Sequence, residues 1–218
     1  MSCAEFDNIG LDINDSKSGC IRSGERYLQR NVNILVNSIP VPWKGEIEYL
    51  GTCILSLKKF TSNCQRMKQK FFCALNGLFS KIGTSTSIAV LSSLINAYCL
   101  PLLLYASEAL NWSQKTERSM DQAYSQAFYK IFKTFDKSII KQCQFYMGSL
   151  PLPFLIDIRK LNFLTKIVNN YCHPLNCLNS IYNNHFKILC VKYSISESDS
   201  QYSRQIKIWR YFENHILQ

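Results

Sequence analysis

The feature that most constrains the fold is a change in the spacing of apolar residues near position 51. Before it, the runs 34–39 and 47–54 are short and rich in β-branched and aromatic residues, as strands are. After it, apolar residues recur every three or four positions, as they do on one face of an α-helix. This order predicts an α+β fold that is predominantly α-helical, with a small antiparallel β element followed by a helical bundle.

The two apolar runs are separated by Pro40, Pro42 and Gly45, which favour a tight connection. We therefore expect the runs to form two joined strands. Side chains of the second run should alternate between two faces, because successive strand residues point to opposite sides. Gly51 in this run has two interpretations: a β-bulge, or a point where another backbone approaches closely.

Apolar stripes at helical spacing indicate a series of helices over 63–82, 87–109, 113–135, 136–148, 154–170 and 205–217. Pro101 should kink the second of these helices, because proline removes a backbone donor and crowds the preceding turn. Ser113 is suited to cap the third helix, and Phe135 is expected to be the last member of its apolar stripe.

The charge balance bears on the partner of the chain. Its 25 Lys and Arg residues against 15 Asp and Glu give a net charge of +10, which favours a polyanion such as nucleic acid. The candidate phosphate contacts, which stand off the apolar stripe of the first helix, are Arg66, Lys68, Lys70 and Lys81. The alternative is that these charges form only a solvated face. Similarly, the mixed aromatic and basic run 128–133 suits either base stacking or a helix core.

A complete enzyme site is not visible in the sequence. The three histidines all lie late in the chain, and neither a nucleophile–base pair nor a glycine-rich phosphate loop is present, so no complete site for a small-molecule substrate is expected. One set has zinc-ligand chemistry in a C-x4-C-x7-H-x4-C spacing: Cys172, Cys177, His185 and Cys190. It lacks a C-x-x-C knuckle, and chance spacing in a chain with ten cysteines is the alternative.

The cysteines and the apolar runs bear on location. The cysteines are spread through long apolar segments rather than packed into a short disulfide scaffold, and the first residues are polar and acidic. The longest apolar run, 94–106, contains Asn96 and Pro101 and is shorter than the roughly 20 residues of a membrane span. We therefore expect no membrane association and an intracellular location, cytoplasmic or nuclear.

Several motifs, taken in order, resemble those of one protein family. They are Gly-Leu-x-Ile-Asn-x-x-Lys-Ser at 10–18, Pro-Trp at 42–43, Glu-Ile-x-Tyr-Leu-Gly at 46–51 and Cys-x-Pro-x-Leu-Leu-Tyr-Ala-x-Glu-Ala at 99–109, with a further run at 143–148. Together they resemble the end of the palm and the thumb in reverse transcriptases of non-LTR (LINE-type) retrotransposons, over roughly residues 8 to 155. Ala106 stands where that family usually has glycine.

The resemblance implies part of an RNA-directed DNA polymerase. It implies that the turn formed by Tyr49, Leu50 and Gly51 grips the primer end, and that Lys17 lies near the incoming phosphates as a possible proton donor. In the family, paired aspartates bind magnesium ions that clamp the reacting oxygens. This chain has no adjacent aspartates, so the resemblance implies a truncated fragment, cut after the catalytic carboxylates, with no cofactor of its own and inactive alone.

On this interpretation the chain has three regions. Residues 1–57 are a partial palm with a hairpin like the primer grip, 58–150 are a thumb-like helical domain, and 151–218 are a C-terminal helical extension. The expected partner is a nucleic-acid duplex of RNA and DNA. The alternative function is a basic helical interaction module that binds RNA or a protein partner without polymerase function.

Overall fold

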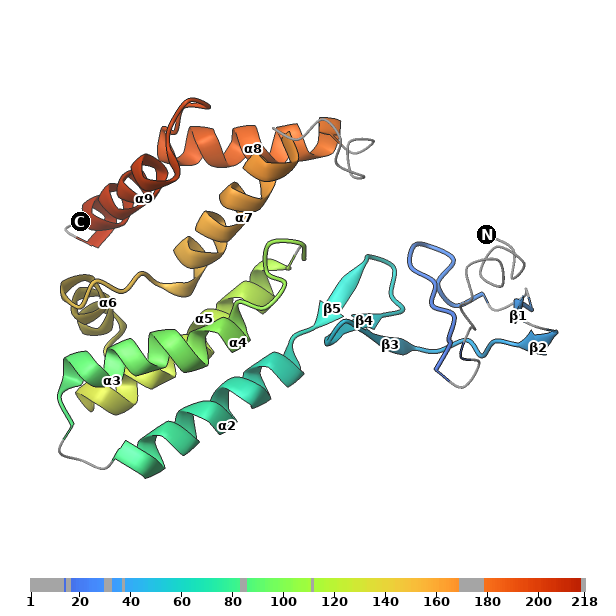
Figure 1. Ribbon diagram of the computed structural model, residues 1–218, viewed down its shortest axis with the longest axis horizontal. Coiled ribbons are helices and arrows are strands. Elements are labelled where there is room, and N and C mark those ends of the chain that lie inside the picture. Colours follow the sequence, from blue (N-terminus) through green and yellow to red (C-terminus); the bar gives the residue numbers. More distant parts are fainter. Residues whose placement is uncertain are drawn as a thin grey trace. The chain divides into compact units, whose positions relative to one another are not determined.

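The computed structural model describes residues 14, 17–29, 33–36, 38–82, 86–110, 112–168 and 179–216. The chain forms two compact units, residues 1–64 and residues 65–218 (Figure 1). In the described ranges, every strand belongs to the first unit and every helix to the second. The α+β, mostly helical fold class is therefore confirmed. The further division of the helical part at position 150 stays a prediction.

The strands of the first unit form two small antiparallel sheets. They are β1 (Leu35–Val36), β2 (Ile39–Pro40), β3 (Glu46–Tyr49), β4 (Thr52–Leu55) and β5 (Thr61–Asn63). β1 pairs with β2, while β3, β4 and β5 lie side by side in that order (Figure 1).

The expected pairing of run 34–39 with run 47–54 is wrong, because each run folds back on itself. The second run reverses at Leu50 and Gly51, whose φ angles of 48° and 75° lie in the left-handed region. Strand alternation therefore does not continue through position 51. Gly51 is a turn residue, so the β-bulge interpretation is wrong, and the close approach of another backbone stays a prediction.

Polar and aromatic contacts attach residues 20–22 to the segment before β3. The backbone N–H of Cys20 donates to the carbonyl of Pro42 at 2.9 Å, and the N–H of Lys44 donates to the carbonyl of Cys20 at 2.8 Å. The Arg22 guanidinium lies 4.9 Å from the centre of the Trp43 ring, a cation–π distance. Backbone hydrogen bonds and a cation–π pair thus attach residues 20–22 to residues 42–44.

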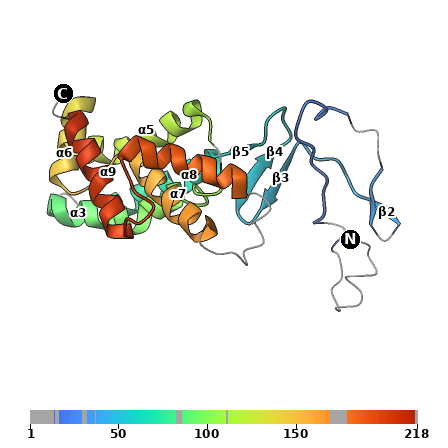
Figure 2. The same ribbon diagram turned by 90° about the horizontal axis from the view of Figure 1, so that it is seen from above.

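The second unit is built from α-helices and one π-helical segment. Their bounds are α2 (Gln65–Ile82), α3 (Ile88–Leu94), the π-helix η1 (Ile95–Cys99), α4 (Leu100–Leu103), α5 (Gln114–Phe132), α6 (Lys137–Tyr146), α7 (Leu152–Val168), α8 (Asn179–Tyr193) and α9 (Gln201–Ile216). α2 packs against η1, α4 and α5, while α7 packs against α5, α8 and α9 (Figures 1 and 2). None of the helices in these ranges is both long enough and apolar enough to cross a membrane.

The apolar stripe of α2 is buried as its spacing predicts. Met67, Phe71 and Leu75 recur every four residues, and all three lie in the core. This places the opposite side of α2 in solvent, where most of its charged residues lie.

The kink expected at Pro101 takes the form of the π-helical segment η1, directly before α4. Proline occupies the first turn of α4, where its missing N–H leaves no interior helix bond unmade. π-helical turns, with their wider spacing, are a recognised way to accommodate such a break. The helix then ends at Leu103 rather than near 109, and Ala106 adopts a left-handed conformation with φ 54°.

Helix α5 starts as predicted and ends earlier than predicted. The Ser113 side chain accepts a hydrogen bond from the N–H of Thr116 at 3.2 Å, which confirms it as the cap. Lys133 ends the helix in a left-handed conformation with φ 53°. Phe135 therefore lies beyond the helix and is exposed, so its expected place in the buried stripe is wrong.

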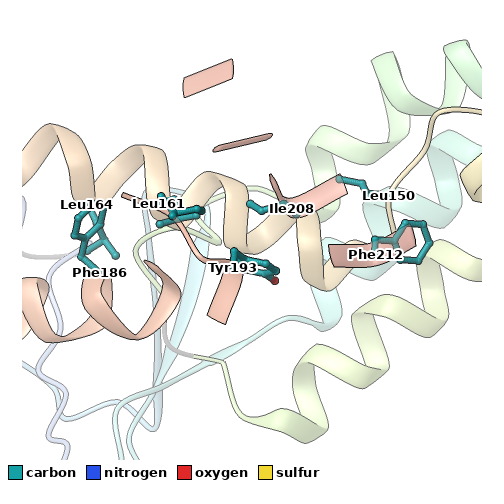
Figure 3. Packing of buried hydrophobic residues seen from close by; sticks show 8 residues of the cluster. Leu150, Leu161, Leu164, Phe186, Tyr193, Ile208 and Phe212 are labelled. Atoms are coloured by element: carbon teal, nitrogen blue, oxygen red, sulfur yellow. The ribbon is translucent and has the colours of Figure 1, made fainter. Parts of the chain in front are cut away.

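A second core joins α7, α8 and α9 and the segment before α7. Its buried members are Leu150, Leu161, Leu164, Phe186, Tyr193, Ile195, Ile208 and Phe212. Figure 3 shows Phe186 against Leu164 at one end of this cluster and Phe212 beside Leu150 at the other. The helical unit is thus packed around apolar contacts along its length.

Candidate nucleic-acid interface

The Tyr49–Thr52 hairpin presents an apolar tip. Tyr49 pairs directly with Thr52, so Leu50 and Gly51 form a two-residue loop, and both have positive φ, as in a type I′ turn. Tyr49 and Leu50 are 64% and 73% exposed. An aromatic ring and an aliphatic side chain held on a rigid turn are suited to contact the bases or sugars of a nucleic acid.

Lys17 lies in a turn organised by Asn14. The Asn14 side-chain oxygen accepts from the N–H of Lys17 at 3.0 Å, and the Asn14 carbonyl accepts from the N–H of Ser18 at 3.1 Å. Asparagine side chains commonly bond the backbone of a turn in this way. The Lys17 side chain is exposed, and its role as a proton donor stays a prediction.

Three of the four basic residues predicted on α2 share one face. At 100° per residue, Arg66, Lys70 and Lys81 fall within an arc of about 60°. All three are exposed, and the middle of their arc lies about 110° around the helix from Phe71, which is at the centre of the buried stripe. We call these three residues the α2 basic face.

Lys68 lies elsewhere on the helix. It is about 160° around α2 from Lys70. It is partly buried, and its Nζ donates to Ser119 Oγ on α5 at 2.9 Å. Lys68 therefore joins two helices and is not part of the α2 basic face.

The net positive charge of the chain comes from the second unit. Residues 65–218 contain 18 Lys and Arg against eight Asp and Glu, whereas residues 1–64 contain seven of each. The excess of +10 therefore belongs entirely to the helical unit. A polyanion would be attracted to this unit, and the attraction would weaken with salt.

The aromatic and basic run 128–133 is mainly structural. Phe128 is fully buried, which agrees with a helix core rather than a stacking surface. Lys130 Nζ donates to Asn76 Oδ1 of α2 at 2.8 Å and lies 5.6 Å from the centre of the Phe79 ring. Lys130 thus ties α5 to α2.

The comparisons with known proteins leave the family open. No protein-family model matches the chain, and no curated protein or solved structure is significantly similar to it. The function is therefore argued from the residues and their geometry.

The zinc-ligand prediction is only half within the described part. Cys172 and Cys177 lie outside the described residues. His185 and Cys190 are both on α8, five residues apart and about 140° around the helix. Cys190 packs against the core of α7–α9, and this burial raises the pKa of its thiol, which disfavours the thiolate form that binds zinc. The zinc site stays a prediction.

One contact that the sequence could not identify supports the segment after α4. Glu108 forms an ion pair with Arg159 of α7, with Glu108 Oε2 and Arg159 Nη1 3.7 Å apart. The same guanidinium donates to the carbonyl of Leu104 at 2.8 Å. Because Leu104 follows the last residue of α4, Arg159 caps the end of this helix from another element.

Proposed function

We propose that this chain is the palm-edge and thumb-like part of a LINE-type reverse transcriptase, and that it holds a primer–template duplex without adding nucleotides by itself. The observation that carries the proposal is the charge distribution. The helical unit carries the whole positive excess, and Arg66, Lys70 and Lys81 stand together on the exposed side of its first helix. Lysine and arginine on such a face neutralise phosphates and release counterions.

Two backbone conformations support the polymerase-like part of this proposal. The resemblance implies a turn at Tyr49–Gly51, and a two-residue turn with positive φ lies there. The family usually has glycine at the position of Ala106, and Ala106 has a φ of 54°, where glycine is favoured. Both features are backbone conformations, so they support the proposal independently of the charge distribution.

The sequence has no adjacent aspartates of the kind that bind magnesium in such polymerases, and two of the described aspartates already have partners. That chemistry needs neighbouring carboxylates free to bind metal ions. Here Asp157 accepts from Lys192 and Tyr193, and Asp199 accepts from Lys207. These side chains serve packing and helix contacts, so no step of nucleotide transfer is assigned to this chain.

The test is to measure the affinity of the chain for a labelled hybrid of an RNA template and a DNA primer. Fluorescence anisotropy gives this affinity at salt concentrations between about 50 and 200 mM. The double substitution Lys70→Gln and Lys81→Gln removes two charges from the α2 basic face. If both residues contact phosphates, the slope of log affinity against log salt should fall by about 1.8. At a salt concentration near 0.1 M the affinity should drop roughly tenfold or more.

The matched control is the double substitution Lys166→Gln and Lys187→Gln. Both lysines are exposed, on α7 and α8, and the change in net charge is the same. Equal losses in the two variants would show that only net charge matters, and the proposal would fail. Tighter binding of single-stranded RNA than of the hybrid would favour the alternative, a basic helical module that binds RNA.

A further inference from the structure

A cavity of about 220 Å³ lies between α5 and α6, and none of the residues of the α2 basic face lines it. This is below the roughly 300 Å³ at which pockets for drug-sized ligands begin, so the cavity suits a small group. Three of its lining residues are cations, Arg118 of α5 and Lys137 and Lys141 of α6. One lining residue, Asp121, is an anion, which leaves an excess of two positive charges.

One residue that lines the cavity has a hydrogen-bond donor without an acceptor. Gln144 lines the cavity and is only 2% exposed, and its Nε2 has no hydrogen-bond partner among the described residues. A buried amide donor with no acceptor costs free energy unless something satisfies it. This observation is independent of the charges, and a ligand acceptor that reached the amide would satisfy it.

The neighbouring carboxylate already has a structural partner. Asp121 Oδ1 accepts from the N–H of Leu152 at 3.2 Å, at the start of α7. Burial raises the pKa of Asp121, and the Leu152 bond and the charges of Lys141 and Lys137 oppose this shift. Both lysines therefore lie close enough to the cavity's one carboxylate to act on it electrostatically.

We infer that this cavity binds a phosphate monoester. Such a group carries a charge of about −1.5 to −2 at pH 7 and offers three acceptor oxygens. The charge matches the excess of two in the cavity lining, and an oxygen can accept from the Gln144 amide. A phosphodiester carries a single charge and matches less well. The group can come from a free phosphate compound or from the 5′ end of a nucleic acid. The site does not depend on the proposed polymerase-like function.

The test is to titrate the full chain with inorganic phosphate and to measure the affinity by isothermal titration calorimetry. The ionic strength is held constant, with chloride as the balancing anion. Lys141→Gln should weaken binding about fivefold or more, since a unit charge at about 4 Å matters by this factor even in water. Asp121→Asn should strengthen binding, because it removes the repelling charge while the amide oxygen can still accept from Leu152.

The opposite signs of these two effects keep the test independent of folding defects, which would weaken binding in both variants. Circular dichroism of each variant verifies that the helices are retained. Equal affinities in the wild type and both variants, or no saturable binding in the wild type, would overturn the inference.

Two oligonucleotides then distinguish the source of the phosphate. If a 5′-phosphorylated strand binds more tightly than its 5′-hydroxyl counterpart, and Lys141→Gln removes the difference, the ligand is a nucleic-acid end. If the two strands bind equally while inorganic phosphate still saturates the site, the ligand is a free phosphate compound. The Lys70→Gln and Lys81→Gln variant should bind inorganic phosphate as the wild type does, so the two proposals can fail separately.

Discussion

Tyr124 is the largest side chain that is fully buried in the helical unit, and its hydroxyl belongs to a small polar network. The hydroxyl donates to Asn96 Oδ1 at 2.9 Å, and Asn96 Nδ2 donates to Ser149 Oγ at 3.2 Å. The network therefore joins α5 to the π-helical segment η1 and to the connection before α7. Burial raises the pKa of Tyr124 far above its ordinary value, so its hydroxyl stays protonated as a donor.

Tyr124→Phe removes this donor and keeps the ring. A neutral hydrogen bond contributes about 1 kcal/mol, and an acceptor left without its partner adds desolvation, so the expected loss of unfolding free energy is about 1–2 kcal/mol. Asn96→Ala removes both bonds and should cost about 2–3 kcal/mol. Each single substitution removes the Tyr124–Asn96 bond, and the double variant loses this bond only once. A double-mutant cycle should therefore give a coupling energy of about 1 kcal/mol between the two residues.

Urea unfolding followed by far-ultraviolet circular dichroism measures these values, because the helices that give the signal are those of residues 65–218. Tyr129→Phe is the control, on the same helix and partly buried. It should change the unfolding free energy by less than about 0.5 kcal/mol. A loss for Tyr124→Phe no larger than for this control, or a coupling energy near zero, would refute the argument that the network stabilises the unit.

Two further predictions concern catalysis and pH. The isolated chain should extend no primer on an RNA template in the presence of magnesium, because its sequence has no adjacent aspartates to bind the metal ions; measurable nucleotide incorporation in a primer-extension assay would contradict this. Hydrogen bonds from Lys207 and the N–H of Ser196 lower the pKa of Asp199, so its stabilising effect is complete above about pH 4 and is lost as the pH falls through the lowered value. Melting temperatures between pH 2 and pH 5 should thus fall less steeply with acid for Asp199→Asn than for the wild type.

Helical spacing predicted the second unit well because a helix stripe is a local pattern. The burial of Met67, Phe71 and Leu75 follows from their steps of four alone. The errors lie at the helix ends. Phe135 continues the spacing, but Lys133 takes a left-handed conformation that ends the helix before it. Lysine gives no signal for this conformation, unlike glycine or asparagine.

Strand pairing was harder to predict because the turn signals were misleading. The prolines and glycine between the two apolar runs suggested the connection there. The real reversal is at Leu50 and Gly51, where leucine occupies a left-handed position that asparagine or glycine usually fills. Only the resemblance implied a turn at this point.

The candidate interface was predictable in part. The common face of Arg66, Lys70 and Lys81 follows from their spacing on any helix. The same spacing puts Lys68 on another side of α2, but its hydrogen bond to Ser119 of α5 is a contact that spacing cannot reveal. The cavity between α5 and α6 was missed for the same reason, since its cations come from two helices whose packing is a property of the folded chain.

Ion pairs within the helical unit cannot neutralise its net positive charge. Each ion pair within the unit, such as Glu117 with Lys160 or Asp157 with Lys192, uses one charge of each sign. With eight acidic residues against 18 basic ones, every possible pairing leaves the same excess of ten. Self-repulsion of this kind destabilises a compact state and is relieved only by salt or by a bound polyanion. The same excess that would draw a nucleic acid to the unit therefore makes the unit more stable once the nucleic acid is bound.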